Sequence, residues 1–250
     1  MEVVADRRGV RRYGRSAVVY TPVALLLIVF VSAFGVSVFF RVTAIIVSGA
    51  SRYAPEEIIG KSGLEIGDNL IFVDGNTAGR RLMQLPYVRE VRITRRLPDT
   101  IEIIISEAVP MAVIRVDGED WLIDADARIL ERIDGGESAR HIAVRGIALI
   151  SPAPGGKAKV APESETRLYY LTELLRAISD KGVQGDIDDV DMSNISNITF
   201  LYKGVKVEMG SGESAGYKIE RMIGVEEDVR RAGGEAGKID VSKDGRSNAW

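Results

Sequence analysis

Ser214 lies in the run GESAG, residues 212–216, which matches the G-x-S-x-G pattern of serine hydrolases. In those enzymes the serine occupies a tight strand-to-helix turn, and a histidine base follows it in the chain. The single histidine of this sequence, His141, precedes Ser214 instead. We therefore interpret the motif as a glycine-rich turn at which a helix begins.

Lys61, Ser62 and Gly63 form a second sequence that resembles a catalytic motif, the K-[ST]-G of penicillin-recognising enzymes. Those enzymes also need a nucleophilic serine in an S-x-x-K sequence, and this chain has no S-x-x-K. We interpret Lys61 and its neighbours as the end of a helix.

Four aspartates, Asp186, Asp188, Asp189 and Asp191, could suggest a calcium loop. Such a loop needs a third oxygen ligand where Val190 stands, followed by a glycine, so we expect a solvated turn. A lone imidazole such as His141 cannot build a metal site, and the chain has no cysteine. We expect no catalytic residue, no metal and no cofactor. The formal net charge of −3 gives no reason to expect a nucleic-acid partner.

Residues 16–40 carry no charged side chain. About 20 apolar helical residues suffice to span a bilayer. The run is longer than the apolar part of a cleaved signal peptide and has no polar face such as a core helix shows. It therefore predicts an uncleaved transmembrane signal-anchor helix. Five arginines in the tail 1–15 predict a cytoplasmic N-terminus with the rest of the chain outside; they are Arg7, Arg8, Arg11, Arg12 and Arg15.

Residues 42–110 alternate between strand and helix signals. An apolar strand is followed by a helix that starts at Pro55, a second helix at 77–86, and two alternating strands at 87–98 and 100–107. In the second helix, Leu82, Met83 and Leu85 should face the core, and Pro86 should end it. We expect a three-stranded sheet with two helices on one face, within an α+β fold.

Residues 111–250 predict a second, mixed α/β domain with a largely antiparallel sheet. Its expected strands are 121–124 and 128–133, flanking a turn, then 141–146, 189–193, 198–204 and 205–210. The expected helices are 163–181, with leucines at helical spacing, and a last one that ends at Gly233-Gly234. Between them, residues 151–162 are rich in Pro and Gly and predict an exposed loop.

The closing run KIDVSKDGRSNAW predicts one more strand, because Ile239 and Val241 alternate with Asp240 and Ser242. With no later element expected beside it, the strand would be a sheet edge that could accept a strand from a partner. Alternatively, it only closes the sheet and frays. The candidate partner-binding residues are Lys238, Ile239, Asp240, Val241, Ser242, Lys243 and Trp250.

Several short motifs are similar to those of a known family: V-x-G after the apolar run, SGL-x-x-G-D-N, PYV-x-x-V and R-x-LP-D-T-I-x-I. They resemble the POTRA domain of the FtsQ/DivIB bacterial cell-division proteins. One departure is that Glu107 is followed by Ala108 and Val109 before Pro110, where the family often has Glu-Arg. A looser likeness to the family's second, β domain covers IDDVDMSNISNITFLYKGVKVEMG and YKIERM through GKIDVS.

The resemblance implies a non-catalytic scaffold in the cell membrane, concentrated at the division septum. It implies protein partners resembling FtsL and FtsB/DivIC, contact with a septal penicillin-binding protein, and influence on septal peptidoglycan synthesis. The final strand would receive the FtsB-like partner. An anchored cell-wall enzyme would need a nucleophile–base or metal constellation, and a POTRA-bearing translocation component would need tandem repeats or a barrel.

Overall fold

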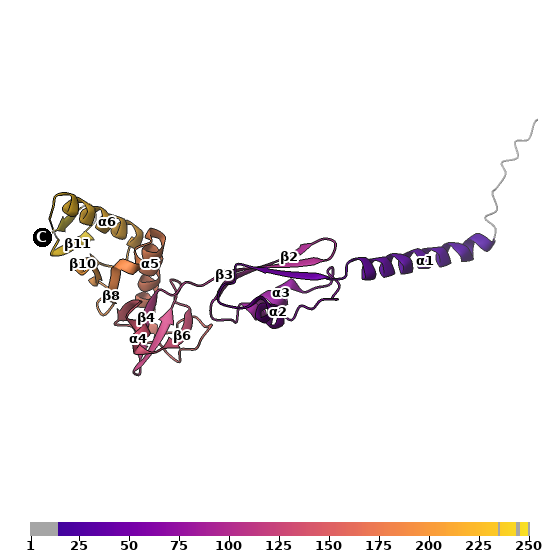
Figure 1. Ribbon diagram of the computed structural model, residues 1–250, viewed down its shortest axis with the longest axis horizontal. Coiled ribbons are helices and arrows are strands. Elements are labelled where there is room, and N and C mark those ends of the chain that lie inside the picture. Colours follow the sequence, from indigo (N-terminus) through magenta and orange to yellow (C-terminus); the bar gives the residue numbers. More distant parts are fainter. Residues whose placement is uncertain (1–14, 235, 244–245, 250) are drawn as a thin grey trace, which may run out of the picture.

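The computed structural model describes residues 15–234, 236–243 and 246–249. Figure 1 shows an elongated molecule in which helix α1 is followed, along the long axis, by a small three-stranded unit and then by a larger unit with the C-terminus. We call these the first unit (residues 42–107) and the second unit (residues 112–249). Both mix helices with sheet, as expected for an α+β fold.

Helix α1 (Arg15–Phe39) covers the predicted uncharged run, with Pro22 inside it. Its large apolar side chains are exposed, Phe30 by 73%. Within the described residues, however, no helix combines the length and apolar character that crossing a membrane requires. The predicted transmembrane span is therefore unconfirmed. Arg15 is the first residue of α1, and the other four tail arginines lie outside the described residues.

The first unit contains the five predicted elements in the predicted order. They are β1 (Ala44–Ser48), α2 (Pro55–Ser62), α3 (Gly75–Leu82), β2 (Val88–Arg96) and β3 (Thr100–Glu107). The sheet order is β1-β3-β2, with β1 parallel and β2 antiparallel to β3. Both helices lie on one face of the sheet (Figure 1). Ile101, Ile103 and Ile105 are buried beneath them, which confirms the face predicted from alternation.

Local sequence explains both helices of the first unit. Pro55 opens α2 at a position where its missing N–H is not needed, and Gly63 ends it in the left-handed conformation at φ 71°. The side chain of Asp74 caps α3 by accepting from the backbone N–H groups of Asn76 and Thr77, each at 3.1 Å.

Helix α3 is shorter than predicted. Leu82 is fully buried, but Met83 is 37% exposed and Leu85 is only partly buried, so the expected core position of Met83 is wrong. A proline ring clashes with the helical carbonyl four residues before it, here that of Leu82, so Pro86 ends the helix at Leu82 rather than at its own position.

The second unit holds nine strands within the described ranges, in the order β12-β11-β10-β9-β8-β7-β4-β5-β6. Five of the eight pairings are antiparallel, and those of β4 with β7, β7 with β8, and β10 with β11 are parallel. The strands are β4 (Ala112–Val116), β5 (Glu119–Ile123), β6 (Ile129–Ile133), β7 (Ile142–Arg145), β8 (Ile187–Asp191), β9 (Ile198–Tyr202), β10 (Val205–Gly210), β11 (Lys238–Lys243) and β12 (Arg246–Ala249).

Two long helices, α5 (Glu165–Lys181) and α6 (Ala215–Arg231), lie side by side against the C-terminal part of the sheet (Figure 1). Leu171, Leu175 and Ile178 of α5, with Ile219 and Met222 of α6, are fully buried in its core. The remaining helical pieces are short: α4 (Gly135–Ser138), η1 (Pro162–Ser164) and η2 (Gln184–Asp186).

Strand β4 was not predicted, because both of its faces are buried. Ala112 and Ile114 lie in the main core of the second unit. Val113 instead packs in a smaller cluster with Tyr87, the residue just before β2. A strand covered on both sides shows no alternation of apolar and polar residues.

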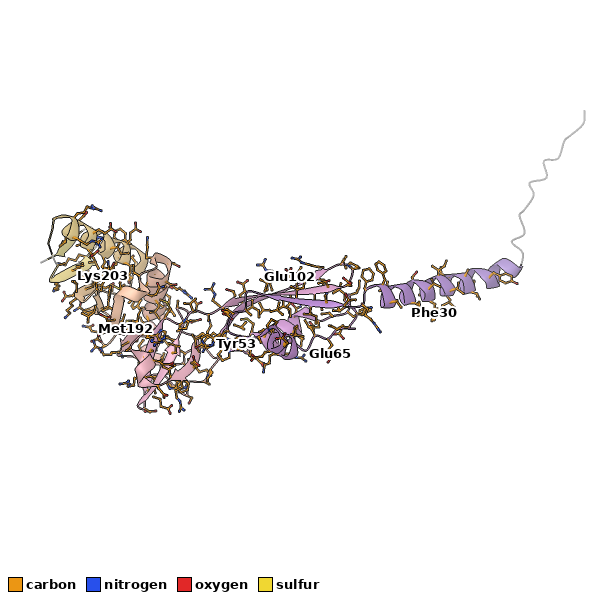
Figure 2. The ribbon with its side chains drawn as sticks, viewed as in Figure 1. Phe30, Tyr53, Glu65, Glu102, Met192 and Lys203 are labelled. Carbon is orange, nitrogen blue, oxygen red and sulfur yellow. The ribbon has the colours of Figure 1, made fainter. Side chains whose placement is uncertain are left out.

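Side chains and backbone carbonyls join the two units. The guanidinium of Arg128 donates to the backbone oxygens of Met83 (2.5 Å), Leu85 (3.1 Å) and Pro86 (3.0 Å), at the carboxyl end of α3. Tyr53 packs against the small cluster around Tyr87 and lies near the second unit in Figure 2. The units therefore meet through a specific interface.

Arg52 and Glu131 complete this interface. Glu131 accepts hydrogen bonds from the Tyr87 hydroxyl and from Arg52, the latter at 2.8 Å. The Arg52 guanidinium lies 3.7 Å above the centre of the Tyr87 ring. Burial raises the pKa of Tyr87, so the hydroxyl stays a donor at neutral pH. Glu107, at the departure from the family pattern, holds Arg52 in place by accepting from its backbone N–H at 2.9 Å.

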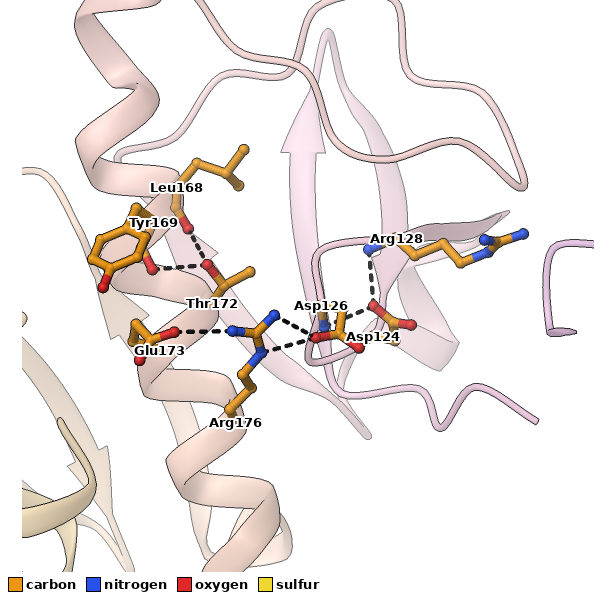
Figure 3. Close-up of polar contacts among 8 residues, drawn as sticks. All are labelled: Asp124, Asp126, Arg128, Leu168, Tyr169, Thr172, Glu173 and Arg176. Atoms are coloured by element: carbon orange, nitrogen blue, oxygen red, sulfur yellow. Dashed lines mark hydrogen bonds and ion pairs between the residues drawn. The ribbon is translucent and has the colours of Figure 1, made fainter. Parts of the chain in front are cut away.

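The turn that carries Arg128 is also tied to α5 (Figure 3). Asp124 Oδ1 accepts from the backbone N–H groups of Asp126 (2.9 Å) and Arg128 (2.8 Å). Asp126 in turn binds Arg176 of α5, at 2.7 Å, and Arg176 also pairs with Glu173. A chain of contacts thus runs from α5 through this turn to the first unit.

Candidate functional site: the C-terminal sheet edge

The structure separates Ser214 from His141. His141 precedes the first residue of β7, whereas Ser214 follows β10 and begins α6. Strand β7 is parallel to β8, β8 is antiparallel to β9, and β9 is antiparallel to β10. Strands β7 and β10 therefore run in the same direction. The two residues therefore lie at opposite ends of the sheet and cannot form a nucleophile–base pair. The predicted start of a helix at Ser214 is confirmed.

The K-[ST]-G motif and the aspartate cluster both lie in regular secondary structure or next to it. Lys61 is in the last turn of α2, which confirms the predicted helix end. The aspartates were expected in a turn, which is wrong in part: Asp188, Asp189 and Asp191 belong to β8, where Asp189 pairs with Arg145 across to β7. Over the residues that the structure describes, no three His, Asp or Glu side chains converge as metal ligands do.

The predicted C-terminal strand is present as β11. Ile239 and Val241 are fully buried, and the residues between them are partly exposed, as the alternation predicted. Strand β11 is parallel to β10, with Lys206 opposite Lys238 and Glu208 opposite Asp240.

Strand β11 is not the edge of the nine-stranded sheet, however, so the predicted edge position is wrong. Strand β12 pairs with it antiparallel, with Ile239 opposite Ala249 and Lys243 opposite Arg246. Among the described strands β12 has a neighbour on one side only, so its backbone forms the outer edge. The missed signal is Asp244-Gly245, a dipeptide typical of two-residue hairpin connections. Trp250 lies outside the described residues.

Several contacts fix β11, the strand on which β12 is built. Arg221 of α6 donates to the backbone oxygen of Lys243 at 2.8 Å, and its guanidinium lies over the Tyr217 ring. Lys238 pairs with Glu208 of β10, also at 2.8 Å. Neither contact was predicted from the sequence. Each joins two elements that become neighbours only when the sheet folds.

Two further features shape the end of β11. Gly210 has φ 72°, and a Cβ there would lie 2.9 Å from the Cβ of Ser242, so only glycine allows β10 and β11 to approach this closely. The carboxylate of Asp240 accepts the backbone N–H of Ser242 at 2.9 Å. Hydrogen bonding to Ser242 lowers the pKa of Asp240, which is therefore ionised at neutral pH.

Two other outer strands, β2 and β6, have features that disfavour strand addition. The outer strand β2 of the first unit carries Arg89, Glu90 and Arg92, charges of the kind that discourage strand pairing. Part of β6 is covered by the loop 151–162, whose Gly155 and Gly156 exchange backbone hydrogen bonds with Ile129, each at 2.8 Å. Strand β12 is the other outer strand of the nine-stranded sheet.

Two family models match the chain. The POTRA domain, FtsQ-type, matches residues 40–108, and the C-terminal domain of cell division protein FtsQ/DivIB matches residues 112–242. The second match alone covers more than half of the chain.

Characterised relatives cover both units. The chain is 26% identical over 207 residues to the cell division protein DivIB of Clostridium tetani, covering 82% of this chain and 77% of that protein. It is 28% identical over 194 residues to the cell division protein FtsQ of Geobacter sp., covering 76% of this chain and 68% of that protein. The cell division protein FtsQ of Corynebacterium glutamicum is 34% identical over 107 residues, 41% of this chain and 48% of that protein. With its POTRA unit and its mixed nine-stranded unit, the chain belongs to the FtsQ/DivIB family of bacterial cell-division proteins.

Proposed function

We propose that this chain is a non-catalytic scaffold of the bacterial division machinery, anchored in the cell membrane at the septum. The observation that carries the proposal is the edge formed by β12 on the firmly held strand β11. A sheet edge can accept an extended segment of a partner, whose backbone supplies affinity while side chains supply selectivity.

The proposed partners are small bitopic proteins resembling FtsB/DivIC and FtsL, with a septal penicillin-binding protein as a further contact. A strand of the FtsB-like partner would add to β12. The predicted residues of β11, Lys238–Lys243, would then act mainly by holding β12, and Trp250 stays a predicted contact of the partner. Through these partners the scaffold would influence septal peptidoglycan synthesis.

The anchor part of the proposal rests on the uncharged run at 16–40 and on the five arginines that precede it. We propose that α1 lies in the membrane with residues 1–15 in the cytoplasm and that residues 42–110 and 111–250 form two domains outside. Protease added to cells without their wall should then degrade everything after Arg41. Survival of a C-terminal epitope would contradict this topology.

Strand β12 gives a direct test of partner binding. Successive backbone N–H groups of a strand point to opposite sides, so proline at Ser247 or at Asn248 removes either a bond to β11 or an outward donor. We expect one of these two variants to lose capture of the FtsB-like partner from solubilised membranes while keeping wild-type thermal unfolding. Capture at wild-type strength by both variants and by a chain truncated after Lys243 would place the docking surface elsewhere.

A further inference from the structure

The end of the first unit nearest α1 carries four large apolar side chains that are not part of its core. Phe72 is 79% exposed, Ile66 71%, Leu97 69% and Ile71 44%. Three of them come from the loop between α2 and α3, and Leu97 comes from the tip of the β2–β3 hairpin. We call these four residues the apolar collar.

Hydrogen bonds place both loops beside the chain as it leaves α1. On one side, Leu70 N–H donates to the Phe40 oxygen (2.7 Å) and Gly67 N–H to the Val42 oxygen (2.8 Å). On the other side, Thr43 donates to Asp99 from its backbone N–H (2.8 Å) and from its hydroxyl (2.7 Å). Figure 2 shows Glu65, next to Ile66, at the end of the unit that faces α1. The two loops that carry the collar therefore both lie beside the residues that follow α1.

One contact reaches beyond the exit. The side-chain amide of Asn69 donates to the Val36 backbone oxygen, within the last turn of α1, at 3.3 Å. A helix rises about 1.5 Å per residue, so Val36 lies roughly 4.5 Å inside the helix end at Phe39. The loop that carries Ile66, Ile71 and Phe72 thus stands level with the last apolar turn of α1 rather than below it.

We propose that the apolar collar inserts into the outer surface of the lipid bilayer and seats the first unit on the membrane. This inference rests on the proposed membrane position of α1. The occupant is lipid because Asn69 holds the loop of the collar beside the last turn of α1, a helix on which Phe34 and Phe39 are themselves exposed by more than 60%. Apolar side chains beside charged ones are typical of segments that enter the boundary between headgroups and acyl chains. Glu65 and Arg41, both exposed, would lie among the headgroups.

The lack of cysteine in the chain makes a depth measurement direct. Spin labels would be placed singly on the full-length chain in phospholipid nanodiscs, through Ile66→Cys and Leu97→Cys, one in each loop. Phe30→Cys reports on α1, and Ile150→Cys is the matched control, an exposed apolar residue of the second unit. The readout is accessibility to oxygen, which concentrates in lipid, against a nickel chelate, which stays in water. Circular dichroism checks that each variant folds.

We expect the ratio of oxygen to nickel accessibility at positions 66 and 97 to exceed that at position 150 several-fold, and to approach that at position 30. If position 30 is in lipid but positions 66 and 97 match position 150, the collar does not insert, and the proposed anchor still stands. If position 30 is itself in water, the anchor fails and the collar proposal with it. Shielding at 66 and 97 that requires an added protein partner would also overturn lipid as the occupant.

Discussion

Arg128 shows how one side chain can join two folding units. Its guanidinium donates to three backbone oxygens at the end of α3. One of them, the oxygen of Leu85, also accepts from the backbone N–H of Val88. A planar fork of donors is suited to such a set, and the single ammonium of lysine is not. We expect Arg128→Lys to lower the free energy of unfolding by about 2 kcal/mol and to speed hydrogen exchange at residues 84–87.

The matched control is Arg132→Lys, four residues further along the chain and within β6. Arg132 is 61% exposed and pairs with Glu119 at the surface. Exposed pairs contribute about 0–1 kcal/mol, so this variant should stay close to wild type. Equal destabilisation by the two variants would mean that the carbonyl contacts of Arg128 do not hold the units together.

Asp124 should give the protein an unusual pH response. Asp124 is only 3% exposed, and burial raises the pKa of its carboxyl although two backbone N–H groups donate to it. The folded protein therefore holds the proton of Asp124 more tightly than the unfolded chain does. By linkage, the contribution of Asp124 to stability falls as pH rises from its ordinary pKa of 3.8 to its raised value, and is constant outside that window.

We expect Asp124→Asn to remove this contribution, because the amide oxygen can still accept from Asp126 and Arg128 without carrying a charge. The stability of the variant relative to wild type should therefore increase as pH rises through the window, as measured by denaturant unfolding at several pH values. Asp240, whose pKa is lowered, has the opposite sign and is present in both proteins, so it cancels in the difference. A difference that is independent of pH would show that Asp124 has an ordinary pKa.

At the scale of elements, the sequence was most informative where a strand or helix has one exposed face. The isoleucines of β3, the leucines of α5 and the pair Ile239 and Val241 all lie on the buried faces that their spacing predicted. The missed strands, β4 and β12, lack that contrast: β4 is buried on both faces, and β12 reads RSNA. Each adjoins an Asp-Gly dipeptide, at 117–118 and 244–245, which is the signal that could have found them.

The element that supports the candidate site is α6. Its Arg221 donates to the Lys243 oxygen, at the last residue of β11 and just before the connection to β12. Removing this contact in Arg221→Ala should cost about 1 kcal/mol locally. Hydrogen exchange at residues 241–243 and 246–249 should then speed up roughly fivefold, because this free energy sets the population of the open state.

Arg230→Ala is the control on the same helix. The side chain of Arg230 is 67% exposed and pairs with Glu226 at 4.0 Å. We expect it to leave exchange in β11 and β12 unchanged. Hydrogen exchange in β11 and β12 could speed up in Arg221→Ala alone while both variants still bind the FtsB-like partner as wild type does. That result would mean that the proposed docking does not depend on an ordered β12.

At the scale of the whole molecule, the interface between the units determines how far the C-terminal edge stands from α1. The contacts between the two units could not be predicted from the sequence. The donors come from Arg52 and Arg128, while the acceptors are mostly backbone oxygens, which every residue has and no sequence pattern marks. The interface arises only once β4 to β6 bring Arg128 to the end of α3 and Glu131 to Arg52.

Gly155 offers a test of whether this interface is rigid. It has φ 82°, and a Cβ there would lie 2.7 Å from the backbone oxygen of Gln84 in the first unit. Its hydrogen bonds to Ile129 hold it in place, so Gly155→Ala should push the units apart. Gly118→Ala is the control, because Gly118 has φ 83° but open space around its Cβ position. In both variants the left-handed conformation of the new alanine costs about 1 kcal/mol. The two variants therefore differ only in the contact with Gln84.

Spin labels at Glu56→Cys on α2 and Asp180→Cys on α5, both exposed, report the distance between the units by pulsed electron paramagnetic resonance. We expect one narrow distance distribution for the labelled wild-type chain and for Gly118→Ala, and a shifted or broadened one for Gly155→Ala. Partner capture should weaken only in Gly155→Ala if partners bind both the edge at β12 and a surface near the membrane. Broad distributions in all three proteins would mean that the units move independently, and the first unit then could not set the height of the docking edge above the membrane.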